Sequence, residues 1–441
     1  MKKRKRTLLS LLGTLIVVSM VLGAVPVFAA NTGYLITDFS AANMKDGIEF
    51  ATKYTVGNTA FVDSELAKIY LVGNCTNGSV EIGNSEQMSI FGDYKPNSAN
   101  KNKARLYIQS QQYASRTDNL TMCKFDFNPI NIADDVYADF IFYGYNGSAD
   151  KKMYTLRVYK DKVEALNSTS TTVEATFTYS DYFKDKTYHE LAFVINKDDD
   201  KVYIYIDGIL FRDGVDSYNE VNSFKYANIL CASNFIRSNL FLDNIYFIFG
   251  DTFANVSVSA PETVKVGDTL TVTTAEQNNS GANGGKTFVW KADNEIIAVG
   301  GSSLNIKGRY NGKNITVETC GYDDVTGMYG QKRTTSGTMV EYTGTVSLKT
   351  GEDSNNQPTV TANIELSNFF TQEGNSGKSF VYLLAGYDGD MIVDCAISKQ
   401  ITISDASAEL TVTGVDSVDK VKLFVWDSMG TLVPVENVFT W

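Results

Sequence analysis

Alternation of apolar and polar residues with a period of two is the feature that most limits what this chain can fold into. The pattern recurs in short runs bounded by polar turns: Val136 to Tyr145, Met153 to Tyr159, Leu191 to Asn196, Lys201 to Ile206 and Phe241 to Phe249. Asp207-Gly208 turns the fourth run directly into Ile209 to Phe211. Hairpins in immediate succession form an antiparallel sheet. We therefore predict an all-β protein.

The length and composition of the chain indicate several β-domains. A chain of 441 residues exceeds what one hydrophobic core usually serves, and 25 Tyr, 25 Phe and only 6 Pro suit strands. About 220 residues of alternating runs are typical of a two-sheet jelly roll. We predict a signal peptide (1–30), a jelly roll (31–250), an immunoglobulin-like sandwich (251–342) and a C-terminal β-sandwich module (343–441).

The N-terminal residues have the layout of a secretory signal peptide. Basic residues at positions 2–6 precede an apolar stretch from Leu8 to Phe28, and small residues follow at Ala29 and Ala30. The apolar stretch is also long enough for a transmembrane anchor. The small residues and the polar start at Asn31 favour cleavage. We expect a secreted chain, extracellular or associated with the cell surface, without a membrane span after cleavage.

The charge and the cysteines exclude two classes of site. The whole chain carries a net charge of −12, and removal of the five basic residues near the N-terminus leaves 34 basic against 51 acidic residues, or −17. Such a chain repels phosphate backbones, so nucleic acid is excluded as a partner. The 5 Cys contain no C-x-x-C spacing, which argues against zinc and thioredoxin-like sites. At most two disulfides are possible, and we expect none.

The stretch Thr187 to Ile195, followed by Val202 to Gly208, resembles the laminin-G-like, concanavalin-like jelly rolls. Those domains typically carry an aromatic-His pair, an apolar strand, a short turn and a second apolar strand that ends in Asp-Gly. Tyr188 stands here where that family usually has Trp. The resemblance implies the jelly-roll fold and carries little about function.

The ends of the predicted jelly roll resemble those of carbohydrate-binding modules. Phe241 to Phe247 looks like their last strand, and Asp38-Phe39 matches the Asp-Phe often found in their first strand. Such modules commonly pair these two strands, so we expect Asp38 and Asp243 to approach each other. In similar jelly rolls, Asp on these strands often helps to hold a structural calcium ion, which takes oxygen ligands. The alternative is that both side chains are exposed or form turn hydrogen bonds.

Two later stretches resemble modules of secreted bacterial proteins. Val264 to Val272, Phe288 to Lys291 and Gly312 to Val317 follow the order of bacterial immunoglobulin-like sandwiches with a central Trp290. The tail from Lys422 to Pro434 looks like a C-terminal sandwich module appended to many secreted glycan-active proteins. These resemblances imply an extracellular bacterial protein in which the two sandwiches act as spacers.

Catalytic chemistry has little support in the sequence. His189 is the one histidine, so any Ser-His-Asp or Cys-His unit must use it, and a structural role at a strand end is the simpler interpretation. Glycoside hydrolases of concanavalin-like fold place paired carboxylates on one strand as Glu-x-Asp-x-x-Glu, a spacing that this chain lacks. We interpret the protein as non-catalytic. A polysaccharide hydrolase or lyase with a site assembled from distant strands is the alternative.

Glycan binding needs aromatic faces for the sugar C–H groups and polar side chains for the hydroxyls. The predicted jelly roll has no Trp, so Tyr must supply the faces. The candidate ligand-binding residues are Tyr143, Tyr145, Tyr154, Arg157 and Tyr159. For each Tyr, packing within the sheet is the alternative. We predict a jelly roll that binds an extracellular polysaccharide or a cell-surface glycan, and the alternative is a surface adhesive or structural protein with a protein partner.

Overall fold

The structure is a computed structural model. It describes residues 31–440 apart from 47, 56–58, 73–77, 84, 93–104, 168, 184–185, 217–220, 222, 232–237, 266–267, 279, 308–309, 311, 342–344, 366–378, 402–406 and 427–438. The predicted signal peptide, residues 1–30, lies outside the described residues. None of the helices in the described part has the length and apolar content needed to span a bilayer. The described chain is all-β, as predicted.

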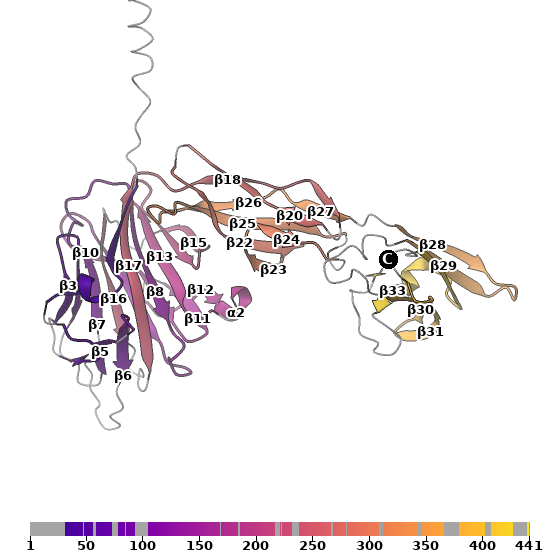
Figure 1. The fold of residues 1–441 in the computed structure, drawn as a ribbon, viewed down its shortest axis with the longest axis horizontal. Helices are drawn as coiled ribbons and strands as arrows, with labels where there is room; N and C mark the ends of the chain where they lie inside the picture. Colours follow the sequence, from indigo (N-terminus) through magenta and orange to yellow (C-terminus); the bar gives the residue numbers. More distant parts are fainter. Residues whose placement is uncertain are drawn as a thin grey trace, which may run out of the picture.

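Residues 32–250 form two large antiparallel sheets packed face to face as a jelly-roll sandwich (Figure 1). Sheet I contains, in spatial order, β15 (Ile209–Asp216), β14 (Lys201–Ile206), β13 (His189–Asn196), β8 (Leu120–Asn128), β17 (Asn239–Gly250), β6 (Met88–Gly92), β5 (Gly78–Ile82) and β2 (Lys53–Tyr54), and β1 (Thr32–Thr37) also pairs with β17. Sheet II contains β12 (Val173–Thr178), β11 (Lys162–Leu166), β10 (Asp150–Val158), β9 (Ala138–Tyr145), β16 (Ser223–Cys231), β7 (Arg105–Ser110), β4 (Ala67–Leu71) and β3 (Ala60–Asp63). The short helices are η1 (Ala41–Asn43) and α2 (Tyr179–Tyr182).

The core of the jelly roll lies between the two sheets because alternate residues of each strand face inward. On β9, Phe140 and Phe142 are buried while Ile141 between them is partly exposed. Phe142 of sheet II stacks on Phe193 of sheet I, with ring centroids 4.0 Å apart and planes 3° apart. The expected pairing of the first and last strands is confirmed, since β1 runs antiparallel to β17.

The following residues form smaller sheets. One contains β19 (Thr263–Lys265), β27 (Thr338–Glu341), β25 (Asn314–Tyr322), β22 (Gly284–Ala292) and β23 (Glu295–Gly300), with β26 (Tyr329–Thr334) beside β25. The pairs β18 (Val256–Ser259) with β21 (Thr273–Glu276), and β20 (Thr269–Thr271) with β24 (Ser303–Asn305), complete this part, which we call the second domain. Trp290 is 1% exposed in its core and donates from Nε1 to the carbonyl of Gly301 at 3.0 Å.

The last part of the chain has two facing sheets. One contains β28 (Thr345–Glu352), β29 (Pro358–Glu365) and β32 (Ser407–Thr413). The other contains β31 (Met391–Ile397), β30 (Val381–Asp388), β33 (Val421–Trp426) and β34 (Phe439–Thr440), and η4 (Val418–Lys420) precedes β33. Their inner faces share a compact apolar core that includes Tyr382 and Leu423.

The jelly roll and the second domain share a buried apolar cluster. Met122, Val194 and Tyr205 from the outer face of sheet I pack with Met328 and Tyr329 of the second domain. Figure 1 shows the second domain extending from the side of sheet I, with β23 above α2. A continuous apolar contact of this kind is typical of domains that move together.

Candidate ligand-binding cavity

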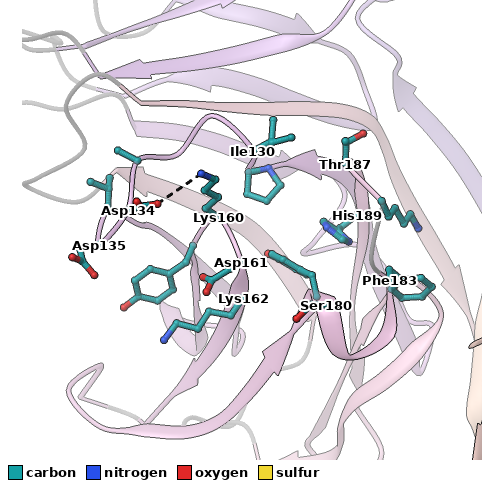
Figure 2. Close-up of a pocket in the computed structure, with 16 residues that line it drawn as sticks. Ile130, Asp134, Asp135, Lys160, Asp161, Lys162, Ser180, Phe183, Thr187 and His189 are labelled. Carbon is teal, nitrogen blue, oxygen red and sulfur yellow. Dashed lines mark ion pairs between the residues drawn. The ribbon is translucent and has the colours of Figure 1, made fainter. Parts of the chain in front are cut away.

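A cavity of about 680 Å³ opens at one end of the jelly roll. We call it the rim cavity. Its walls come from both sheets: the β8–β9 connection (residues 129–136), the β10–β11 turn (159–162), α2 with Phe183, and the residues that lead into β13 (186–189). In Figure 2, Asp134 and Asp135 lie on one side and His189 and Phe183 on the other. Connections at the end of a β-sandwich are a common place for ligand sites, because the sheets beneath them are rigid.

The β8–β9 connection is held by local hydrogen bonds. Asn128, the last residue of β8, accepts a hydrogen bond from the amide of Ile130 at 2.9 Å through its side-chain oxygen. The amide of Ile132 donates to the carbonyl of Pro129 at 2.8 Å, and that of Ala133 donates to the hydroxyl of Ser238 at 3.1 Å. These bonds fix the wall that carries Asp134 and Asp135.

His189 lies in the opposite wall and is oriented by Asp207. Its Nδ1 lies 2.6 Å from an Asp207 carboxylate oxygen, and the two side chains are 2% and 0% exposed. The same carboxylate accepts a hydrogen bond from the backbone amide of Glu190 at 2.9 Å and forms an ion pair with Lys186. Because one ring nitrogen is tied to a carboxylate, the orientation of the ring is fixed. Within the described residues, no hydrogen bond joins His189 to a Ser, Thr or Cys.

Tyr179 of α2 covers His189. The two rings stack with centroids 4.0 Å apart and planes 13° apart. Tyr179 is 5% exposed, and its buried hydroxyl has no hydrogen-bond partner. Burial raises the pKa of Tyr179 well above its usual range, and the carboxylates of Asp207 and Asp161 add to the shift. The hydroxyl therefore stays protonated, and it is a buried donor and acceptor without a partner behind the cavity wall.

The remaining polar groups of the cavity are of both signs. Lys160 lies 3.7 Å from Asp134, and both are exposed, while Lys186 pairs with the buried Asp207. Ser180, Thr187 and Asp161 add hydroxyl and carboxylate groups, and Tyr159 and Phe183 add aromatic surface. A cavity with donors, acceptors and aromatic rings suits a ligand with many hydroxyls and exposed C–H faces.

The predicted ligand-binding residues occupy three different places. Tyr159 lines the rim cavity, where its ring packs against Tyr137 with centroids 5.6 Å apart. Arg157 lies behind it, paired with Asp139 at 2.9 Å and stacked over Tyr137 at 3.9 Å. Tyr154 lies in the core and is 1% exposed, so its ring cannot meet a ligand.

Tyr143 and Tyr145 lie on the outer face of sheet II, away from the rim cavity. Tyr143 stacks on Tyr226, which stacks on Tyr107, and both centroid distances are 4.6 Å. Tyr145 packs edge-on against Tyr113 at 5.1 Å. Each stack in this row covers one face of Tyr143 and of Tyr107, so packing within the sheet accounts for part of the aromatic surface.

Sequence reasoning missed Tyr179, Asp207 and Lys186. The signal for Asp207 was present, because it follows an apolar strand 18 positions after the only histidine, in an Asp-Gly turn. We interpreted Asp207-Gly208 only as a turn, so the contact between Asp207 and His189 was not expected. Nothing in the sequence indicates that Tyr179, in a four-residue helix, stacks on the same ring.

Asp38 follows the end of β1 and Asp243 lies within β17, near enough for their charges to interact. Hydrogen bonds from Ser40 and Asn43 lower the pKa of Asp38 to about 2. Burial raises the pKa of Asp243 to about 6, and the charges of Asp126, Asp38 and Glu86 add to the shift. Among the residues that the structure describes, no group of three or more His, Cys, Asp or Glu side chains is arranged to hold a metal ion. Structural calcium at Asp38 and Asp243 stays a prediction.

Replacing Asp243 with Asn should stabilise the protein at neutral pH. The folded state holds a proton on Asp243 between pH 3.8 and about 6, where the unfolded chain has lost it, so wild-type stability falls as pH rises through that window. Since Asp243 is only half-buried, we expect a gain of about 1 kcal/mol above pH 6. Thermal unfolding between pH 4 and 8 measures it. Asp38→Asn is the control with the opposite sign, and added calcium that stabilises only the wild type would support the metal prediction.

Comparison with known proteins finds no matching family model and no matching curated protein. Solved structures with distant similarity include the potassium-bound carbohydrate recognition domain of Emp46p, with 9% identity, TM-score 0.29 and coverage of 45% of this chain and 98% of that one. The binding domain of botulinum neurotoxin DC in complex with SialylT has 11% identity, TM-score 0.28 and coverage of 86% and 95%. A sialidase has 10% identity and TM-score 0.29, and this chain spans 19% of its length.

Scores at this level assign no function. The distantly similar structures include a carbohydrate recognition domain and a receptor binding domain, and the chain matches no family model.

Proposed function

We propose that this protein is a secreted, non-catalytic glycan-binding protein whose jelly roll takes part of an extracellular polysaccharide or cell-surface glycan into the rim cavity. The observation that carries the proposal is the 680 Å³ cavity itself, whose walls combine aromatic side chains with charged and hydroxyl-bearing ones. A sugar needs this combination, because its C–H faces pack on aromatic rings and its hydroxyls need donors and acceptors.

The walls of the rim cavity supply both kinds of contact. Tyr159 and Phe183 provide aromatic surface, and the lysine and aspartate side chains provide donors and acceptors. The balance of signs suits a neutral glycan better than a highly charged one. The fixed His189–Asp207 pair then acts as an oriented part of the wall rather than as a catalytic base.

Affinity electrophoresis of the full secreted chain tests the proposal. The gels contain xylan, mannan, starch, pectin, hyaluronan or mucin, and we expect one of the neutral polysaccharides to retard migration. No reducing ends or unsaturated sugars should appear on long incubation. Their release would show a hydrolase or lyase, and the absence of retardation by every polymer would overturn the proposal.

Tyr179→Phe tests the part of the cavity wall that covers His189. It removes only the unpartnered hydroxyl, so the free protein should be as stable as the wild type or more stable by about 1 kcal/mol. Affinity for the retained polysaccharide should stay within about twofold of wild type, because this hydroxyl is shielded from the cavity. Thermal unfolding and calorimetric titration measure the two effects. Loss of both stability and affinity would mean that the hydroxyl serves the fold.

A further inference from the structure

The Asp207-Gly208 turn between β14 and β15 contacts both the rim cavity and the second domain. The carboxylate of Asp207 holds His189 in the cavity wall. The backbone carbonyl of the same residue accepts a hydrogen bond from the hydroxyl of Thr287, on β22, at 2.7 Å. One residue thus joins a cavity side chain to a neighbouring domain.

The contact between this turn and β22 is close. Asp207 and Gly208 have φ angles of 54° and 81°, as in a tight hairpin turn. A Cβ added to Gly208 would lie 2.6 Å from side-chain atoms of both Lys286 and Thr287, so only glycine fits there. The pairing of β22 with β25 shifts register between Gly285 and Phe288, and such a bulge directs Thr287 out of the ladder toward the turn.

A second connection runs through the residue that follows His189. Successive residues of a strand face opposite sides, so His189 faces the cavity while Glu190 faces the second domain. The Glu190 carboxylate accepts a hydrogen bond from the hydroxyl of Tyr329 and pairs with Lys124 at 3.2 Å. The hydroxyl of Tyr205 donates to the carbonyl of Gly330 beside Tyr329, at 3.0 Å.

A third contact involves the helix that carries Tyr179. In Figure 1, α2 lies beneath β23 of the second domain, and the two elements are in contact. The second domain therefore touches each element that positions the stacked pair of Tyr179 and His189.

We propose that the second domain is an integral part of the rim site: through Thr287, Tyr329 and β23 it holds the Asp207 turn, the start of β13 and α2 in the arrangement that a ligand meets. Thr287 and Tyr329 are positioning residues, and ligand binding and domain docking stabilise each other, since coupling between two sites is reciprocal. The inference rests on the proposed function only for what the cavity binds.

Because the chain has one histidine, diethyl pyrocarbonate reports on His189 alone among histidines. His189 is 2% exposed, so its modification requires local opening of the site. Thr287→Val keeps the shape of the side chain and removes the donor to Asp207. In the full chain without glycan, we expect modification of His189, followed by mass spectrometry, to become about fivefold faster.

Matched variants separate this coupling from a general loss of stability. Thr269→Val removes an exposed hydrogen bond to Asn305 (2.8 Å) within the second domain, and it should leave the rate within about twofold of wild type. Thr287→Ser retains the hydroxyl and should restore the wild-type rate. Tyr329→Phe, which removes the donor to Glu190, is an independent second variant and should also accelerate modification, so it decides the matter where Thr287→Val does not fold.

Wild-type rates in folded Thr287→Val and Tyr329→Phe would overturn the inference, as would an equal acceleration in Thr269→Val. The assay contains no glycan. A protein that binds no polysaccharide but shows the acceleration would contradict the proposed function and leave the coupling standing.

Discussion

Replacing Lys124 with Met should lower the free energy of unfolding by about 3 kcal/mol, because it leaves the carboxylate of Glu190 without its cation at a domain boundary. Lys124 Nζ lies 3.2 Å from Glu190, and the two side chains are 8% and 18% exposed. The ammonium also donates to the hydroxyl of Tyr322 at 3.1 Å. Burial acts to lower the pKa of Lys124, but the charge of Glu190 and the contact with Tyr322 outweigh it and raise that pKa.

Chemical denaturation of a double-mutant cycle measures this effect. The double variant Lys124→Met/Glu190→Leu should recover most of the loss, since an apolar replacement of a buried ion pair is often nearly neutral. Lys45→Met, in an exposed pair with Asp63 at 3.4 Å, is the control and should change stability by less than about 0.5 kcal/mol. A Lys124→Met protein as stable as this control would contradict the account of the interface.

Replacing Asp207 should have the largest effect of any single change at the rim cavity. Asp207→Asn keeps a residue that tolerates the φ of 54° but loses the charge that Lys186 and His189 meet, and it should cost about 2 kcal/mol. Asp207→Ala also leaves the backbone amide of Glu190 without its acceptor and places alanine at a positive φ. The free energy of unfolding should therefore fall by about 4 kcal/mol.

Denaturant unfolding measures the free energy of unfolding of both variants, and Asp207→Ala should be the less stable of the two. Diethyl pyrocarbonate should modify His189 faster in both variants than in the wild type. Asp198, in the exposed turn before β14, offers a matched carboxylate, and Asp198→Ala should leave stability unchanged within about 0.5 kcal/mol. Equal stabilities for the wild type and Asp207→Ala would show that the His189–Asp207 contact does not support the fold.

The sequence predicted the scaffold better than the cavity, for a physical reason. Strand alternation is local, so Leu191 to Asn196 and Lys201 to Ile206 could be recognised without knowledge of their neighbours. The same alternation explains why Tyr143 and Tyr145 share the outer face of sheet II. Tyr154 lies on the same strand face as Leu156 and Val158, which are buried in the core, so the alternation that predicted the strand also places Tyr154 there.

The cavity is made by contacts between segments that are distant in sequence. Residues 129–136 reach the same end of the sandwich as residues 159–162 and α2 only because β8 and β13 lie in one sheet and β9, β10 and β11 in the other. The role of the second domain is equally non-local, since Thr287 and Asp207 are 80 positions apart. The prediction of spacer modules rested on resemblance alone, and a resemblance does not describe what a domain touches.

Binding of the retained polysaccharide to Tyr159→Ala and Tyr143→Ala tests the central claim most directly. Both variants shorten a partly exposed tyrosine of the jelly roll, one in the rim cavity and one in the stacked row on sheet II. Our account predicts that calorimetric affinity falls at least about tenfold in Tyr159→Ala and stays within about twofold of wild type in Tyr143→Ala. Loss of binding in Tyr143→Ala with full binding in Tyr159→Ala would contradict it and place the glycan on the face of sheet II.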